Sequence, residues 1–396
     1  MKRLVVLGAL WCACSGTSGA GGATDAGASL GGASGSGAGG ASGRDGAAGS
    51  GGTTGAGGSS VSASSFVLSA YKDVGIDFDW NRNVISTQVS GTAQPLAADL
   101  AAHAGKAITL AFATGECGSE NWAGVPGAAM ATANVASLAD AGIDYLVSTG
   151  GAAGTFTCGS DAGFQTFVGR WMSPHLRGID FDIEAGQTQA IIDALIQRIS
   201  AAHATYPALR FSLTLATLAN NNGGSSAQSL GATVADSFNS FGDQTLQSVA
   251  RTLGVSAATP GSWPTYLTVN LMTMDYGAAS PGVCVVASGS CNMGQSALQA
   301  AYNLRDRWGV PFSNIELTPM IGGNDDSSEH FTLADVDTIS AFATLHGLAG
   351  LHYWSYDRDV DCAPGPASST CNSLGGAGAY GFLGRFARDA PPARSP

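Results

Sequence analysis

The chain has 396 residues, enough for one large domain or two smaller ones. Its 17 lysine and arginine residues stand against 29 aspartate and glutamate residues, which gives a formal net charge of −12. Proteins that follow nucleic-acid phosphates need a basic face, so this charge argues against a nucleic-acid partner. Hydrophobic residues make up 44% of the chain, enough for a full core.

The N-terminus has the pattern of an export signal. Met1-Lys2-Arg3 is followed by an apolar run from Leu4 to Ala13, which is too short to span a bilayer. Cys14 resembles the acylation site of bacterial lipoproteins, and Cys12 lies beside it. We therefore expect residues 1–14 to be a signal peptide. The protein is then either secreted or held by a lipid anchor on the outer surface, on the extracellular or periplasmic side.

Residues 15–60 contain 19 glycines among mostly small residues and show no apolar periodicity. Such a segment cannot bury enough apolar surface to offset the entropy of ordering it, so we expect a flexible linker. Its match to GxGxxG at residues 35–40 neither follows a strand nor opens a helix, and we interpret it as chance.

Between residues 61 and 388, apolar runs alternate with helical patterns, and residues 389–396 are expected to be a disordered tail. Several runs are apolar throughout, which is typical of strands buried on both faces of a parallel sheet. Eight strand–helix steps over roughly 330 residues favour a single (β/α)8 TIM barrel domain, with a doubly wound open sheet as the alternative. The expected strands are Phe66–Tyr71, Ala107–Ala113, Ile143–Thr149, Gly178–Ile183, Arg210–Ala216, Tyr266–Met274, Ile315–Ile321 and Leu348–Trp354. The expected helices include Thr188–Ala204, Gln244–Leu253, Ser296–Trp308 and Leu333–Leu345.

Six cysteines follow the signal, and an even number in an exported chain predicts disulfides. Six cysteines allow fifteen connectivities; among these we expect Cys284–Cys291, Cys362–Cys371 and Cys117–Cys158. The sequence has no CxxC pair and no paired histidines, so we expect no metal site and no cofactor. His352 is interpreted as a satisfied core histidine.

The most informative stretch is the strand Arg177–Glu184, with the sequence RGIDFDIE. Alternate residues of a strand share a face, so Asp180, Asp182 and Glu184 are expected to face the barrel interior. Like charges at such spacing push at least one carboxyl pKa upward, which suits general acid catalysis better than core stability. The alternatives are a structural cluster neutralised by basic residues and a magnesium site; the alternation places Arg177 on the outer face.

This strand resembles the DxxDxDxE signature of family 18 glycoside hydrolases, the chitinases and their relatives, with Arg177 in place of the first Asp. Further stretches are similar to the same family in the same order. Ser148–Gly151 resembles its SxGG motif. Met272–Gly277 (MTMDYG) resembles the sixth strand of a bacterial and archaeal subgroup, Thr318–Gly322 the seventh strand, and His352–Ser355 the eighth. Together these stretches cover most of residues 62–386.

The resemblance implies a TIM barrel and substrate-assisted retaining hydrolysis of β-1,4-linked N-acetylglucosamine. Glu184 would act as general acid and base. Asp182 would orient the acetamido group of the substrate, and Asp180 would share a proton with Asp182. The resemblance also implies a set of substrate-binding residues, with Met274 where many members have tyrosine and Tyr276 taking over that role. These residues are Asp275, Tyr276, Met272, Met274, Trp354 and Tyr71.

We therefore expect a monomeric chitinase-like hydrolase that acts on chitin or chitooligosaccharides. Only about 26 residues separate the seventh and eighth expected strands, which leaves no room for an inserted domain and favours an open groove. Trp80 and Trp122 are weaker candidates for further sugar sites. An endo-β-N-acetylglucosaminidase acting on N-glycans and an inactive chitin-binding lectin remain as alternatives.

Overall fold

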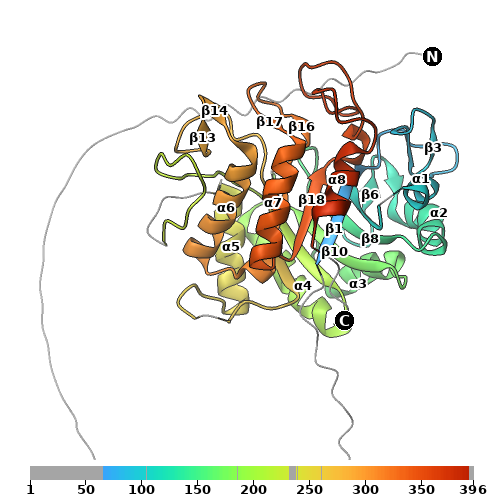
Figure 1. Ribbon diagram of the computed structural model, residues 1–396. Coiled ribbons are helices and arrows are strands. Elements are labelled where there is room, and N and C mark those ends of the chain that lie inside the picture. Colours follow the sequence, from blue (N-terminus) through green and yellow to red (C-terminus); the bar gives the residue numbers. More distant parts are fainter. Residues whose placement is uncertain are drawn as a thin grey trace, which may run out of the picture. The chain divides into compact units, whose positions relative to one another are not determined.

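The computed structural model describes residues 66–103, 105–184, 186–231, 238, 240–259 and 261–391 (Figure 1). The expected signal peptide and linker, with Cys12 and Cys14, lie outside the described residues. Within the described residues, no helix combines the length and the apolar character needed to cross a membrane.

Eight parallel strands of the described chain close into a barrel in the order β1-β18-β15-β12-β11-β10-β8-β4. The first strand pairs in parallel with both the second and the last, which closes the barrel and excludes the open-sheet alternative. All eight expected strands are confirmed, with ends that differ by a few residues. The strands are β1 (Val67–Asp73), β4 (Ala107–Ala113), β8 (Asp144–Gly150), β10 (Leu176–Asp182), β11 (Arg210–Ala216), β12 (Leu267–Met272), β15 (Ile315–Thr318) and β18 (Gly350–Trp354).

One helix follows each barrel strand before the next begins, so the protein is a (β/α)8 TIM barrel (Figure 1). The four expected helices are confirmed. The third of them begins at Met293, three residues before its predicted start, because the Asn292 side chain caps it by accepting from the Gln295 N–H. The helices are α1 (Leu96–Ala102), α2 (Gly127–Asp140), α3 (Asp161–Trp171), α4 (Gln189–Thr205), α5 (Ser240–Leu253), α6 (Met293–Trp308), α7 (Leu333–His346) and α8 (Gly381–Asp389).

The loops between the barrel strands and helices contain short strands and 3-10 turns. Between β15 and β18 the chain forms one small hairpin and α7, so no inserted domain lies there, as the spacing predicts. The short strands are β2 (Ser86–Thr87), β3 (Gln94–Pro95), β5 (Gly115–Glu116), β6 (Asn121–Trp122), β7 (Val125–Pro126), β9 (Phe156–Thr157), β13 (Val286–Ala287), β14 (Ser290–Cys291), β16 (Gly322–Gly323) and β17 (His330–Phe331). The 3-10 turns are η1 (Phe312–Asn314) and η2 (Tyr356–Arg358).

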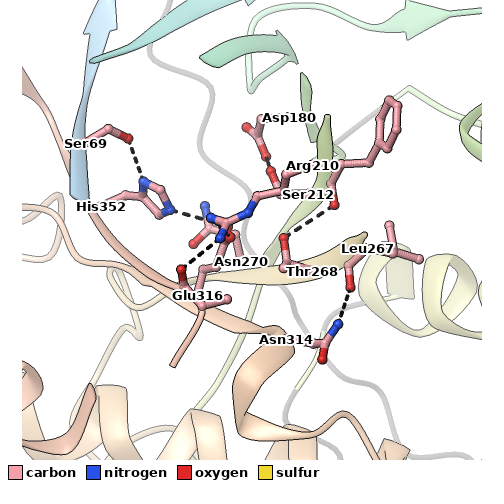
Figure 2. A network of polar contacts seen from close by, with 12 residues as sticks. Ser69, Asp180, Arg210, Ser212, Leu267, Thr268, Asn270, Asn314, Glu316 and His352 are labelled. Atoms are coloured by element: carbon pink, nitrogen blue, oxygen red, sulfur yellow. Dashed lines mark hydrogen bonds and ion pairs between the residues drawn. The ribbon is translucent and has the colours of Figure 1, made fainter. Parts of the chain in front are cut away.

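A polar network lies in the barrel interior near the N-terminal ends of β11 and β15 (Figure 2). Arg210 from β11 donates to Glu316 from β15 at 2.7 Å. His352 from β18 contacts Ser69 at 2.7 Å, and its other ring nitrogen lies 3.3 Å from Glu316. His352 is 2% exposed and lies between Ser69 and Glu316 in this network, so it is a core residue and does not line the cavity.

All three expected disulfides are present. Cys117–Cys158 joins the loops after β4 and β8, Cys284–Cys291 closes the loop before α6, and Cys362–Cys371 closes the loop after η2. Each bridge therefore crosslinks loops outside the barrel wall, and the wall itself is held by packing and strand pairing.

Candidate active site

Asp180 and Asp182 on β10, and Glu184 two residues beyond its end, lie at successive heights inside the barrel, because alternate residues of an extended chain face inward. Their odd-numbered neighbours face the helices, where the ring of Phe181 lies 5.9 Å from that of Phe164 on α3. The neighbouring Arg177 points outward and pairs with Asp144 at 2.7 Å. It therefore does not neutralise the acids.

Asp180 is the deepest of the three, and four hydroxyl groups surround its buried carboxylate. One oxygen accepts from Ser212 (2.6 Å) and Thr214 (2.7 Å) on β11. The other accepts from Ser148 on β8 (2.6 Å) and from the Tyr71 hydroxyl on β1 (2.9 Å). Burial raises the pKa of Asp180, and the four donors act against this rise.

Asp182 and Glu184 form a hydrogen-bonded carboxyl pair above Asp180. Burial, followed by the charges of Glu184 and Asp180, raises the pKa of Asp182 well above its ordinary value. Burial also raises the pKa of Glu184, while its hydrogen bond with Asp182 opposes the rise. Two carboxyl groups in this contact bind a proton between them, since both cannot be charged in a site of low polarity.

We correct the prediction that Asp180 and Asp182 share a proton. Both oxygens of Asp180 are occupied by hydroxyl donors, and Asp182 pairs upward with Glu184. Asp180 acts on Asp182 through its charge, because that charge is among the causes that raise the pKa of Asp182.

The glycines of the Ser148–Gly151 motif bring β8 close to the acidic strand. A Cβ atom on Gly150, which has a φ of +90°, would lie 2.0 Å from the carbonyl oxygen of Asp182. A Cβ atom on Gly151 would meet the ring of Phe112 at 2.8 Å. Glycine is needed at both positions, so this motif has a packing reason in addition to the Ser148 hydrogen bond.

The carboxyl pair opens into a cavity of about 220 Å³ at the C-terminal ends of the barrel strands, where TIM barrels place their active sites. Its floor is aromatic: the Trp354 ring stacks on Phe112 with centroids 5.7 Å apart and lies 6.1 Å from Tyr71. Among the described residues that line the cavity there is no lysine or arginine. The lining residues are Tyr71, Phe112, Ala152, Asp182, Glu184, Thr214, Met272, Met274, Asp275, Thr318, Met320, Asp325 and Trp354.

Asp275 faces this cavity from the loop after β12. Its backbone is left-handed, with a φ of +51°, and its carboxylate accepts from the Asp325 N–H at 2.8 Å. The carboxyl group is open to the cavity but surrounded by the barrel mouth, and this burial raises its pKa to about 6. The charge of Asp275 is also one cause of the raised pKa of Glu184.

The structure brings together most of the residues that the sequence singles out. Seven of them line the cavity, and Asp180 lies directly below. We correct the prediction for Tyr276, whose side chain is only 3% exposed and packs in the core instead of lining the cavity. The left-handed turn at Asp275 ends the strand alternation, so the next side chain no longer points where a strand would direct it.

Sequence reasoning missed several cavity residues. Thr214 and Thr318 occupy inward positions near the ends of β11 and β15, so the same alternation could have found them. Phe112 has the parity of Ile108 and Leu110 in the hydrophobic core and reaches the cavity beside the register irregularity of β4 between Leu110 and Ala113, so alternation alone would have placed it on the outer face. Of the two tryptophans proposed for outer sugar sites, Trp122 is fully buried against Trp171, which rules it out, and Trp80 is 59% exposed.

Metal-ligating side chains gather closely at one place in the described part of the chain, where Glu116 meets Cys117 and Cys158. These two sulfurs form a disulfide and are not thiolates, so this group is a poor ligand set. The cavity acids do not form such a cluster.

No protein-family model and no curated protein matches the chain. Solved structures do match. The catalytic domain of a hyperthermophilic chitinase from Pyrococcus furiosus aligns with a TM-score of 0.56 and 22% identity, covering 82% of this chain and 96% of that one. This chain has the fold of that chitinase domain. Catalytic-site mutants of active domain 2 of the thermostable chitinase from P. furiosus, complexed with chito-oligosaccharides, align with a TM-score of 0.56 and 21% identity over 82% of this chain and 96% of that one.

Proposed function

We propose that the chain is a chitinase-like glycoside hydrolase of the family 18 type, which cleaves β-1,4-linked N-acetylglucosamine polymers. The observation that carries the proposal is the Asp182–Glu184 carboxyl pair at the base of an aromatic-floored cavity. The fold shared with chitinase catalytic domains supports it, as do the four sequence stretches that resemble the family.

Glu184 is the general acid and base in this proposal. Its raised pKa keeps Glu184 protonated to a higher pH than an ordinary glutamate, so it can transfer a proton to the glycosidic oxygen as the bond to the anomeric carbon breaks. The acetamido oxygen of the same sugar attacks that carbon, and an oxazolinium intermediate forms. Glu184, now ionised, then removes a proton from the water that opens the intermediate.

Asp182 orients the acetamido group. One of its oxygens, Oδ1, is buried and has no hydrogen-bond partner among the described residues, so it is available to accept the acetamido N–H. The charge of Asp180 beneath it helps to stabilise the positive charge of the intermediate. Holding the internal nucleophile in place gives it a high effective concentration, which is worth several kcal/mol of the barrier.

Trp354 supplies the apolar floor for the C–H face of the reacting sugar, with Phe112 and Tyr71 supporting the ring. Met272 and Met274 form a wall, and Asp275 contacts sugar hydroxyls or the acetamido group. The described lining residues of the cavity include no basic side chain, which suits a neutral polysaccharide that needs no cationic partner.

Hydrolysis of a chromogenic chitooligosaccharide by the wild type and by Glu184→Gln tests the proposal. We expect turnover in the wild type and a loss of about 100-fold or more in the variant, with chitin binding retained. Binding without turnover in both proteins would favour a lectin. Release of intact glycans from a high-mannose glycoprotein, with no chitooligomers from colloidal chitin, would favour an endo-β-N-acetylglucosaminidase.

We also propose that the enzyme works outside the cytoplasm as a monomer. Three disulfides are compatible with an oxidising compartment. Cell fractionation of the wild type and of Cys14→Ser distinguishes a lipid anchor from simple secretion, because only an anchored protein would move to the soluble fraction on substitution. Light scattering of the purified protein reports its oligomeric state.

A further inference from the structure

The loop that carries Asp275 has a conformation that needs support from outside. We define the Asp275 loop as residues 273–277, directly after β12; Met274 and Asp275 from this loop line the cavity. Asp275 has a φ of +51°, in a region that residues other than glycine adopt at a cost of about 1 kcal/mol. Contacts with the rest of the protein therefore decide where its carboxylate points.

The side chains that bind the backbone of Asp275 and Tyr276 come from one segment, residues 320–331, which follows β15 and contains β16 and β17. The Asn324 side chain accepts from the Asp275 N–H at 3.2 Å. Glu329 accepts from the Tyr276 N–H at 3.0 Å and also from the backbone of Gly277. Consecutive N–H groups of the Asp275 loop are thus bound by two side chains of a distant segment.

Glu329 is built into this position. Its side chain is fully buried, its N–H donates to the Asp326 carbonyl at 3.0 Å, and its own carbonyl accepts from the Asn324 N–H at 3.0 Å. No ion pair involving Glu329 is present among the described residues, and its Oε1 has no hydrogen-bond partner. A buried acid without a basic partner is a poor choice for stability alone, which points to a role in the site.

We propose that Glu329 is a positioning residue, which holds the Asp275 loop by its backbone and so keeps the Asp275 carboxylate in the cavity wall near Glu184. The inference rests on the proposed function, since it assigns Glu329 a part in the same reaction. The coupling runs from Glu329 to the N–H groups of Tyr276 and Gly277, then to Asp275, and from Asp275 to Glu184 through the electric field.

Other titratable groups surround Glu329, and a test must separate them from it. Asp275 and Tyr276 face it from the Asp275 loop, and Asp326 from its own segment. Arg358 and Asp325 act on Asp275 from the side; the guanidinium of Arg358 donates to the carbonyls of Ile321 and Gly323. These groups are unchanged when Glu329 alone is substituted.

The experiment compares Glu329→Gln and Glu329→Met, each alone and combined with Asp275→Asn, on a chromogenic chitooligosaccharide from pH 4 to 9. The Gln variant keeps an oxygen for both N–H groups, so we expect kcat/KM within about threefold of the wild type. The Met variant leaves both without an acceptor, and we expect a loss of about 30-fold. The alkaline limb of its pH profile of kcat/KM should also move to lower pH, as in Asp275→Asn. The reason is that the Asp275 charge no longer raises the pKa of Glu184.

The double variant decides between positioning and general damage. When Asp275 is already replaced, adding Glu329→Met should lower kcat/KM by less than about a further threefold, because the residue that Glu329 positions is gone. Fully multiplicative losses, or an unchanged alkaline limb in Glu329→Met, would overturn the proposal. Glu120→Met is the matched control: Glu120 is a buried glutamate outside the cavity, paired with Arg170 at 2.7 Å, so its loss should lower thermal stability without moving the limb.

Amide hydrogen exchange gives a readout that needs no activity. We expect faster exchange at Tyr276 and Gly277 in Glu329→Met and wild-type rates in Glu329→Gln; equal rates in all three proteins would overturn the proposal. An inactive wild type would refute the proposed function, and the exchange rates would still decide whether Glu329 holds the loop. If the Met variant does not fold, Glu329→Asp replaces it, because the shortened acid no longer reaches both N–H groups.

Discussion

The buried acid Glu329 links the stability of the protein to pH in a direction that can be measured. Burial, followed by the charges of Asp275 and Asp326, raises the pKa of Glu329 from 4.5 to about 8. The folded protein therefore keeps a proton that the unfolded chain releases above pH 4.5. For a group with a raised pKa, the stabilising contribution is complete below the unfolded value and is lost as the pH rises to the folded value.

The magnitude follows from the two pKa values. Each pKa unit is worth about 1.4 kcal/mol, so the values of 4.5 and about 8 correspond to about 5 kcal/mol over the whole range. Between pH 5 and pH 8 the loss is about 3.5 kcal/mol, because titration is incomplete at both ends. Glu329→Gln removes this titration and keeps the acceptor for the Tyr276 N–H. Its free energy of unfolding should therefore rise relative to wild type by about that amount from pH 5 to pH 8.

Urea unfolding of wild type and Glu329→Gln at pH 5, 6, 7 and 8 measures the difference directly. Other raised carboxyl groups, such as Asp357 and Asp359, titrate in both proteins and cancel in the comparison. Glu120→Gln serves as the control, because Glu120 is a second buried glutamate, outside the cavity and paired with Arg170, and its replacement measures the effect of removing a buried carboxyl group elsewhere. A difference between Glu329→Gln and wild type that stays constant from pH 5 to pH 8 would refute the reasoning.

Three further predictions concern the site and its loops. The alkaline limb of the pH profile of kcat/KM should lie above the ordinary glutamate pKa of 4.5, because burial and the charge of Asp275 raise the pKa of Glu184. Asp275→Asn should move this limb to lower pH. A limb that does not move contradicts the assignment. Trp354→Ala should weaken chitooligosaccharide binding by about tenfold, since the aromatic floor is lost; calorimetry with the Glu184→Gln protein checks this, and unchanged affinity counts against the floor. Replacing Cys117 and Cys158 by serine should lower the free energy of unfolding by about 2–4 kcal/mol in urea; equal stability with and without the bridge would show that the two loops are already fixed by packing.

The amino-acid sequence by itself determined the barrel strands and the inward-facing acids. Both are local properties: apolar runs bounded by turns become buried strands, and the alternation of Asp180, Asp182 and Glu184 with apolar residues fixes which side chains share a face. Arg177 was assigned to the outer face on the same basis, and in the structure it pairs there with Asp144. Even the disulfide pairs agree with the sequence, because two of them close short loops.

Tertiary structure decided what depends on contacts between distant segments. The left-handed turn at Asp275 directs Tyr276 into the core, and no strand pattern contains that information. Glu329 lies 53 residues beyond Tyr276 and meets its N–H only because β12 and β15 are neighbours in the closed barrel. Whether Asp182 pairs with Asp180 or Glu184 was likewise decided by hydroxyls from three other strands, which fill the acceptor positions of Asp180. Local patterns specify the elements, and the closure of the barrel specifies which loops and side chains meet at its mouth.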